Sequence, residues 1–352
     1  MKTIMVVGAS GVLGNLICEE LLRIYENQIK LIVTDYKPER GKKLAASFAT
    51  ETTFVQLDIK DETNINQVIK NVDLVIVVLK QQKPHIQRVC IENNIMCIDV
   101  TPFRDFVDKV MELNDMANEN NVGSIVMSGF FPGLSGLVVK EAISPFLEVT
   151  EIDIALLQNT NAKTGLAGIL DMLKIIAEPV MYQKKLLPGF TKKRTMYFIK
   201  HTKDRKVRLI DHSEKAFIKQ RLTTAPLHYW TAWNVSIFNK MVSLLKKAGF
   251  ITFIHKVKPN NLSRLVRHNP TKDENAFITV EVKGVLDNKK LTRRISISAF
   301  SDYHVTAMVT AALAKIALQK EFSGVVFPFK ITNFDEVLSV INCPNAILTE
   351  YT

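Results

Sequence analysis

Three glycines near the start of the chain have the spacing of a phosphate-binding turn. The segment Gly8-Ala9-Ser10-Gly11-Val12-Leu13-Gly14 follows an apolar run and precedes a stretch of helical pattern. In this context Gly8 permits a tight turn, Gly11 lets a pyrophosphate approach the backbone, and Gly14 lets the helix pack on the strand. The N–H groups of the helix N-terminus attract the anion. We therefore predict that all seven residues contact a dinucleotide; the alternative is a strand–helix turn that merely uses glycines.

An acidic residue follows where the adenosine ribose of a dinucleotide would lie. Asp35 comes 21 positions after Gly14, directly after the second apolar run. A carboxylate there accepts hydrogen bonds from ribose hydroxyls and repels a 2′-phosphate, which favours NAD over NADP. NADP stays open because four cations follow closely and could neutralise a phosphate: Lys37, Arg40, Lys42 and Lys43.

Three further residues are candidates for contacts with the adenine end. Tyr36 could cover the adenine face or be a surface aromatic residue. Asp58 and Ile59 follow the third apolar run, and loops at the carboxyl ends of parallel strands meet the adenine. Asp58 could equally well cap the turn that follows it.

Two residues are candidates for proton transfer. Hydride transfer asks a protein mainly to position donor and acceptor, so no conspicuous catalytic group is required. Lys80 follows the fourth apolar run, where desolvation in a cleft could lower its pKa, or it could be a solvated loop lysine. His228 lies in the aromatic segment 226–233 beside both tryptophans. It could donate a proton in a pocket, or belong to the core or a dimer interface.

Another pair of residues is a candidate for binding a substrate carboxylate. Thr164 and Gly165 stand at the start of a helical stretch that follows a predicted strand. Their N–H groups could bind the carboxylate, or the pair could simply begin the helix.

Short apolar runs alternate with helical patterns over the first 125 residues, which is typical of a doubly wound parallel sheet. The predicted strands are 3–7, 29–34, 53–56, 74–79, 96–100 and 123–127, and the predicted helices between them are 12–25, 40–48, 65–70, 85–93 and 105–120. Later segments contain hairpin patterns at 195–210 and 277–299, which predict a largely antiparallel sheet. We expect an α/β fold with a Rossmann domain at 1–130, an inserted α+β domain at 131–300 and a helical C-terminal segment at 301–352.

Several separated segments resemble the saccharopine dehydrogenase-like oxidoreductase family. They are residues 8–14, 57–61, 72–76, 90–101, 129–135, 302–307, 324–325 and 336–338. The resemblance implies an inserted domain that closes over the nicotinamide and often mediates dimerisation, and a C-terminal segment that returns to the Rossmann domain. It also implies hydride transfer at a carbon–nitrogen centre, imine or amine, of an amino-acid-derived substrate.

The resemblance also implies roles for residues that follow the later strands. Leu79, Lys80, Gln81, Asp99 and Thr101 should line the nicotinamide end of the cleft, and Phe131, Pro132 and Gly133 should contact the substrate. The chain departs from the family pattern at residues 79–84, where relatives usually carry a small stretch that contains Gly or Pro.

The basic charge of the chain is local. The 352 residues have a formal net charge of +11, and segment 181–221 alone holds 13 Lys+Arg against three acidic residues. This segment could attract an acidic substrate, dock on nucleic acid or an anionic membrane, or face solvent. Because its cations are spread over hairpin-like strands rather than one amphipathic helix, we do not expect this segment to dock on nucleic acid or on an anionic membrane.

The remaining composition indicates a cytoplasmic enzyme. The apolar runs are far shorter than the roughly 20 residues of a membrane-spanning helix, so we expect no membrane insertion. Four scattered cysteines without metal-ligand spacing predict reduced thiols and no metal: Cys18, Cys90, Cys97 and Cys343. We expect an NAD(P)-dependent oxidoreductase that forms a homodimer and acts on a small molecule. The alternative is a dinucleotide-sensing regulatory protein of the same fold without turnover.

Overall fold

The structure is a computed structural model that describes residues 1–48, 51–163, 166–248, 268–344 and 346–352. The chain divides into two compact units. Unit 1 consists of Met1–Leu137 and Tyr303–Asn342, and unit 2 of Val138–Asp302 and Cys343–Thr352. None of the helices in these described ranges is long and apolar enough to cross a membrane.

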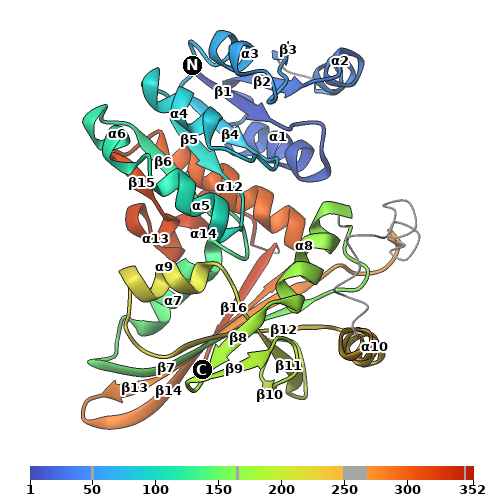
Figure 1. Ribbon diagram of the computed structural model, residues 1–352, viewed down its shortest axis with the longest axis vertical. Coiled ribbons are helices and arrows are strands. Elements are labelled where there is room, and N and C mark those ends of the chain that lie inside the picture. Colours follow the sequence, from blue (N-terminus) through green and yellow to red (C-terminus); the bar gives the residue numbers. More distant parts are fainter. Residues whose placement is uncertain (49–50, 164–165, 249–267, 345) are drawn as a thin grey trace. The chain divides into compact units, whose positions relative to one another are not determined.

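Unit 1 contains a seven-stranded sheet whose strands all pair in parallel, in the order β15-β6-β5-β4-β1-β2-β3 (Figure 1). The strands are β1 (Lys2–Val7), β2 (Ile29–Asp35), β3 (Thr52–Gln56), β4 (Leu74–Val77), β5 (Met96–Asp99), β6 (Gly123–Val126) and β15 (Gly324–Val326). The helices are α1 (Val12–Ile24), α2 (Pro38–Ser47), α3 (Glu62–Val68), α4 (His85–Glu92), α5 (Arg104–Met111), α6 (Asn114–Glu119), α7 (Leu134–Ile143, which runs on into unit 2), α12 (Asp302–Ala317), α13 (Pro328–Ile331) and α14 (Phe334–Ile341). The predicted doubly wound sheet is confirmed, with β15 as an additional strand.

The order of the strands reverses between β1 and β4. From β1 the chain adds β2 and β3 on one side, and then β4, β5 and β6 on the other. The central strands are apolar along their length because helices cover both faces of such a sheet; all four residues of β4 are buried. Ligands of doubly wound folds bind at the carboxyl ends of the strands beside this reversal.

Unit 2 contains a second seven-stranded sheet, in the order β10-β11-β12-β7-β13-β14-β16. Its strands are β7 (Glu148–Gln158), β10 (Lys193–Met196), β11 (Arg205–Ile210), β12 (Leu227–Trp233), β13 (Ala276–Leu286), β14 (Lys289–Ala299) and β16 (Ile347–Tyr351), and a separate hairpin is formed by β8 (Pro179–Tyr182) and β9 (Lys185–Pro188). The helices are α8 (Leu166–Ala177), α9 (Glu214–Arg221) and α10 (Ser236–Lys247). Only β7 and β12 pair in parallel among these strands, so the predicted largely antiparallel sheet is confirmed.

The two predicted hairpins differ in how closely they match the structure. β13 and β14 turn at Asp287 and Asn288, both with positive φ, as expected for a two-residue turn. In the other hairpin the paired part of the two strands ends farther from the turn than predicted, because β10 ends at Met196 and β11 begins at Arg205. The backbone between them bonds instead to side chains of β13 and β14: Thr279 Oγ1 donates to Tyr197 O at 2.8 Å, and Ile199 N–H donates to Ser296 Oγ at 2.9 Å.

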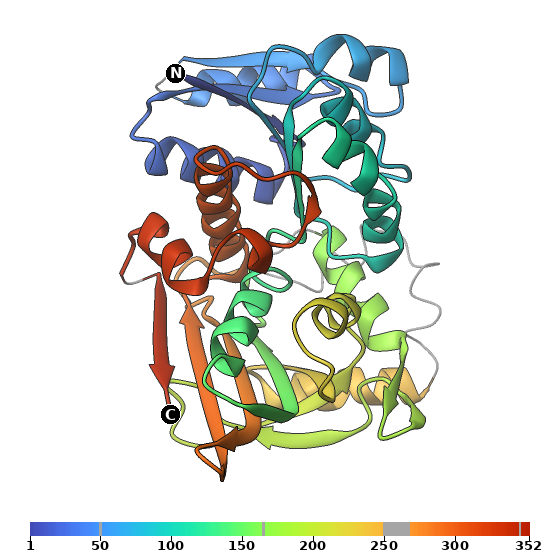
Figure 2. The same ribbon diagram turned by 90° about the vertical axis from the view of Figure 1, so that its left-hand side faces the viewer.

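The last residues of the chain form a strand that the sequence did not predict. β16 pairs with β14 in antiparallel fashion (Figure 2). The segment after residue 301, expected to be helical throughout, thus supplies β15 to the sheet of unit 1 and β16 to that of unit 2.

Candidate functional site

The glycine turn of unit 1 connects β1 to α1 with very little space between them. Gly8 has a φ of +90°, which favours glycine, and Gly11 N–H donates to its carbonyl at 3.1 Å. A Cβ on Gly14 would lie 2.2 Å from Gly8 O and 2.8 Å from Ala9 Cα. Glycine at positions 8 and 14 is therefore required by the fold of the turn itself.

Gly11 has no comparable structural reason to be glycine. It is exposed, its φ of −73° and ψ of 164° suit any residue, and a Cβ there would meet only Gly8 O, at 3.3 Å. It is the N-cap of α1, whose first turn holds no acidic side chain. The helix therefore presents backbone N–H groups and the positive end of its dipole at a surface that a side chain would obstruct.

At the end of β2, Asp35 is already engaged by a cation. Arg40 donates from Nε to Oδ2 at 2.6 Å and from Nη2 to Oδ1 at 2.8 Å, and Lys37 N–H donates to Oδ1 at 2.8 Å. Burial raises the pKa of Asp35, but the hydrogen bonds from Arg40 and Lys37 and the charge of Arg40 outweigh it and hold the pKa below its ordinary value. Asp35 is thus an ionised acceptor with an exposed arginine beside it.

The neighbouring predicted residues lie on the same side of the unit. Arg40 and Lys37 each lie 5.5 Å from the centre of the exposed Tyr36 ring. Asp58 is exposed, and its carboxylate accepts a hydrogen bond from Lys60 N–H at 3.0 Å, while Asp61 rather than Asp58 caps α3. Ile59 packs against the core of unit 1.

The residues after β4 lie beside the glycine turn. A Cβ on Gly8 would come within 3.2 Å of the Leu79 side chain, so Leu79 lies where β1 and β4 separate. Lys80 is exposed, and its Nζ is 4.8 Å from the centre of the Phe103 ring. Gln81 Nε2 donates to Asp99 Oδ2 at 3.4 Å. Residues 79–81 thus lie between the glycine turn and the end of β5 and contact both.

Asp99, at the end of β5, is a buried carboxyl held by three groups. Thr101 N–H donates to Oδ1 at 2.6 Å, and the fully buried Gln87 donates to Oδ2 at 2.6 Å. Burial raises the pKa of Asp99 to about 6, against the hydrogen bonds from Thr101 and Gln87, which lower it. A carboxyl group with such a pKa can exchange a proton in the neutral range.

The loop after β6 is tightly built. Pro132 and Gly133 are buried and Phe131 is half-buried. Gly133 has a φ of +118°, and a Cβ there would lie 2.5 Å from the carbonyls of Gly129 and Met127. Thr306 Oγ1, on α12, accepts a hydrogen bond from Phe130 N–H at 3.2 Å. Packing alone thus accounts for Gly133, and substrate contact by this loop stays a prediction.

His228 lies in unit 2, within a buried cluster of charged groups. Its Nδ1 is 3.7 Å from Asp153 Oδ1 and 4.0 Å from Glu151 Oε1, and its ring lies 4.8 Å from that of Tyr182. Burial lowers the pKa of His228, although Asp153 and Glu151 act to raise it. The imidazole is therefore mainly neutral at pH 7.

The same cluster could supply three ligands to a divalent cation, but its charges already balance. Glu151, Asp153 and His228 each offer one ligand atom, all within 4.8 Å of one another. The carboxylates are paired with cations of the protein: Asp153 with Arg194, Glu151 with Lys283 at 2.7 Å, and Glu281 with Arg194 at 2.7 Å and Arg294 at 3.1 Å. We therefore interpret the cluster as a buried ion network.

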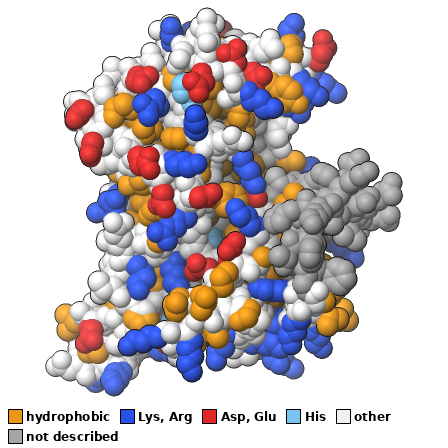
Figure 3. All heavy atoms as spheres, viewed as in Figure 1, with side chains coloured by type: hydrophobic (Ala, Val, Ile, Leu, Met, Phe, Trp, Pro, Cys, Tyr) orange, Lys and Arg blue, Asp and Glu red, His pale blue; other side chains and the backbone are white. Residues whose placement is uncertain are grey.

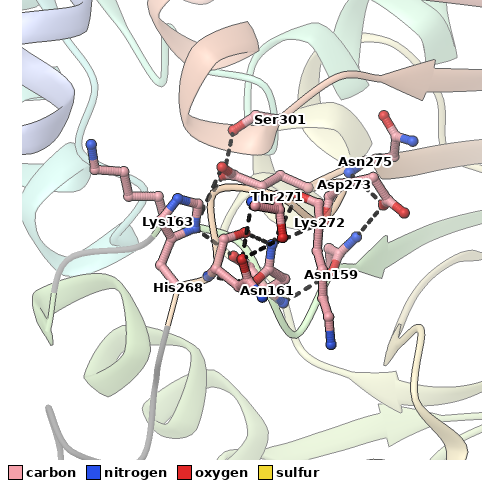
Figure 4. Close-up of polar contacts among 11 residues, drawn as sticks. Asn159, Asn161, Lys163, His268, Thr271, Lys272, Asp273, Asn275 and Ser301 are labelled. Carbon is pink, nitrogen blue, oxygen red and sulfur yellow. Dashed lines mark hydrogen bonds and ion pairs between the residues drawn. The ribbon is translucent and has the colours of Figure 1, made fainter.

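A hydrogen-bonded network fixes the loop at the end of β7 (Figure 4). Asn161 Nδ2 donates to the carbonyls of Asn269 and Lys272 at 3.0 and 3.1 Å, and Asn159 Nδ2 donates to Asp273 Oδ1 at 2.7 Å. Lys163 N–H donates to Glu274 Oε2 at 2.9 Å. Thr164 and Gly165, predicted to bind a substrate carboxylate, follow this loop but lie outside the described residues.

Sequence reasoning missed the partners of several site residues. The sequence indicates Arg40 as a possible phosphate partner but not as the ion-pair partner of Asp35, and it gives no sign of the contact between Gln87 and Asp99. One signal was available for the cluster in unit 2: Glu151 and Asp153 alternate with isoleucines in an apolar strand, which places two carboxylates on one buried face.

The chain combines a Rossmann-type unit with a second unit that is built on a mixed sheet. Solved dehydrogenases share this fold. Saccharopine dehydrogenase (L-Glu forming) from Saccharomyces cerevisiae superposes with a TM-score of 0.72 and 12% sequence identity, covering 100% of this chain and 99% of that chain. DAP dehydrogenase from C. glutamicum, in complex with DAP, gives a TM-score of 0.50 and 13% identity, covering 98% and 96%. At these identities the likeness concerns the fold, and at that level the expected resemblance to saccharopine dehydrogenases is confirmed.

The match found from the sequence alone covers a smaller part of the chain than the structural matches do. The NmrA-like family profile matches residues 1–92, which include the glycine turn and β1 to β4. No curated protein shows a significant match to the sequence.

Proposed function

We propose that the protein is an NAD(P)-dependent oxidoreductase that transfers hydride at the carbon–nitrogen centre of an amino-acid-derived substrate. The observation that carries this proposal is the turn between β1 and α1, where Gly11 leaves a helix N-terminus open although the fold does not require glycine there. The names of the two similar dehydrogenases support the reaction class and the amino-acid character of the substrate.

We propose that residues of unit 1 bind each part of the dinucleotide. The N–H groups at the start of α1 would hold the pyrophosphate, Asp35 and Arg40 the adenosine ribose, and Leu79, Asp99 and Thr101 would adjoin the nicotinamide. When bound, the cofactor supplies the hydride acceptor or donor. The protein's own part is then to position the substrate, exclude water and exchange one proton.

Lys80 is the residue that we propose for proton exchange. It follows β4 beside the strand reversal, whereas His228 is a largely neutral imidazole within an ion network. A Lys80→Met variant should lower kcat and leave the affinity for the cofactor unchanged. Loss of cofactor affinity together with kcat would instead make Lys80 a binding residue.

Two measurements on the full chain test the proposed function. Calorimetric titration with NAD⁺, NADP⁺ and their reduced forms should show binding of at least one of them. A panel of amino acids and polyamines, with the preferred cofactor, should then show a change in NAD(P)H absorbance. Binding without turnover on the panel would favour the dinucleotide-sensing alternative, and absence of binding would reject both functions.

The choice between NAD and NADP should depend on Arg40. Because its guanidinium neutralises Asp35 and is exposed, it can turn to pair with a 2′-phosphate. An Arg40→Gln variant should bind NADP⁺ about tenfold more weakly. This factor corresponds to the lower end of the free energy that a hydrogen bond to a charged group contributes. The affinity for NAD⁺ should change less. Arg104→Gln, which removes an exposed arginine paired with Asp108, is the matched control. Equal loss for both cofactors would contradict this role of Arg40.

A further inference from the structure

Exposed apolar side chains are concentrated on one part of unit 2. Among the described residues, fourteen large hydrophobic side chains are exposed, and five of them lie within eleven positions on or directly before α10: Val235, Ile237, Met241, Leu244 and Leu245. Ile237 and Leu244 are 77% and 68% exposed. Two more, Met181 and Leu186, face each other across the β8–β9 hairpin. A concentration of this kind marks an interaction surface.

The inward side of helix α10 holds both polar and apolar residues: Asn239 and Val242 are buried, and the half-buried Phe238 ring packs edge-on against Trp233 with ring centres 5.0 Å apart. Asn239 is buried and binds the backbone of Trp233, accepting from its N–H at 2.9 Å and donating to its carbonyl at 2.6 Å. Ser243 accepts a hydrogen bond from Arg208 at 3.2 Å. At 100° per residue, Ile237, Met241, Leu244 and Leu245 share the opposite side. A helix that only completed the core of a soluble unit would bury that apolar side.

The hairpin is held next to α10. Lys246, near the end of the helix, donates to the carbonyls of Ile176 and Gly189, which flank the hairpin on either side. Val180 and Leu187 of the hairpin pack against the core of the unit. The hairpin thus adjoins the inward side of α10, and we call residues 179–188 and 235–247 together the α10 face.

Lysines are frequent in and around this face, and the acidic residue next to it in the sequence is Glu178, whose charge acts on Lys246. Segments 179–200 and 235–248 contain nine Lys+Arg and no Asp or Glu. Seven of the nine are exposed lysines: Lys184, Lys185, Lys192, Lys193, Lys200, Lys240 and Lys247. Figure 3 shows Lys and Arg side chains, with hydrophobic ones among them, in the lower part of the molecule, where Figure 1 places the β8–β9 hairpin and α10.

We propose that the α10 face docks unit 2 on an anionic lipid surface. An apolar stripe bordered by lysines suits the boundary between lipid headgroups and acyl chains, because the stripe enters the boundary while the lysines pair with anionic headgroups. A nucleic acid would leave the apolar stripe in water, and a second copy of this chain would bring two lysine-rich surfaces together. The charge of the face therefore favours the lipid, and the inference does not depend on the proposed enzymatic function.

Co-sedimentation with lipid vesicles tests this proposal on the full chain. With vesicles of phosphatidylcholine and 30% phosphatidylglycerol, the protein should sediment at least tenfold more strongly than with phosphatidylcholine alone. Raising NaCl from 0.1 to 0.5 M should reduce this binding, since salt screens exposed charges. Ile237→Ser with Leu244→Ser should weaken it about tenfold, as should Lys240→Glu with Lys247→Glu.

Matched controls separate the α10 face from general surface effects. Leu147, 79% exposed in unit 2 outside the face, is the apolar control as Leu147→Ser. Lys289→Glu with Lys290→Glu, which changes exposed lysines of β14, is the charge control. The proposal is overturned by absence of vesicle binding, by equal loss in the controls, or by light scattering that shows a dimer broken by the α10 substitutions. Binding to a DNA oligonucleotide in preference to the vesicles would also overturn it.

Discussion

Replacing Gly11 by valine should abolish tight binding of NAD(P) while leaving the fold intact. The backbone at Gly11 has an extended conformation that valine favours, and an added Cβ would lie 3.3 Å from Gly8 O, a tight contact that a small shift of the turn relieves. The side chain would instead occupy the space in front of α1, where a pyrophosphate needs direct access to backbone N–H groups. We expect the affinity to fall at least 100-fold, equivalent to about 2.7 kcal/mol.

The measurement is a titration of intrinsic NAD(P)H fluorescence, combined with thermal unfolding. Gly14→Ala is the contrasting variant, because its Cβ would lie 2.2 Å from Gly8 O and must distort the turn. It should lower the melting temperature clearly more than Gly11→Val, whose Cβ would lie 3.3 Å from the same oxygen. Unchanged cofactor affinity in Gly11→Val would show that no dinucleotide approaches this turn.

Replacing Asp99 by asparagine should remove a large pH dependence of stability. Burial raises the pKa of Asp99 from 3.8 to about 6, so the folded state holds this proton more tightly than the unfolded state. The contribution of Asp99 is therefore fully present below about pH 4 and is lost as the pH rises through 6. About two pKa units at 1.36 kcal/mol each give about 3 kcal/mol.

Urea unfolding of both proteins between pH 4 and 7 checks this expectation. Over this range the free energy of unfolding should fall by about 2 kcal/mol more in the wild type than in Asp99→Asn, because part of the full effect is already lost at pH 4. Asp58→Asn, which changes an exposed carboxylate of the same unit, should retain the pH dependence of the wild type. Parallel curves for the wild type and Asp99→Asn would mean that ionisation of the Asp99 carboxyl group costs the folded state little free energy.

The parts of the fold that local sequence patterns determine could be predicted. The alternation of apolar runs and helical patterns identified β1 to β6, because a covered parallel sheet needs strands that are apolar on both faces. The glycine spacing identified the turn before α1, and Asp287-Asn288 identified the turn between β13 and β14.

Features that depend on distant partners could not be predicted. β15 and β16 are short strands whose partners lie far away in the sequence, so their own patterns are weak. The partnership of Asp99 with Gln87 joins a strand to a helix, and the cluster of Asp153, Arg194 and His228 joins three strands of one sheet. Periodicity likewise cannot tell which side of an amphipathic helix turns inward, and in α10 the side with Asn239 and Val242 does.

A crystal structure of the chain with NADH or NADPH tests the central claim most directly. The account predicts the pyrophosphate at the N–H groups that begin α1, the adenosine ribose beside Asp35 and Arg40, and the nicotinamide near Leu79 and Asp99. A dinucleotide bound away from the Gly8–Gly14 turn, or crystals that take up neither cofactor at millimolar concentration, would contradict it.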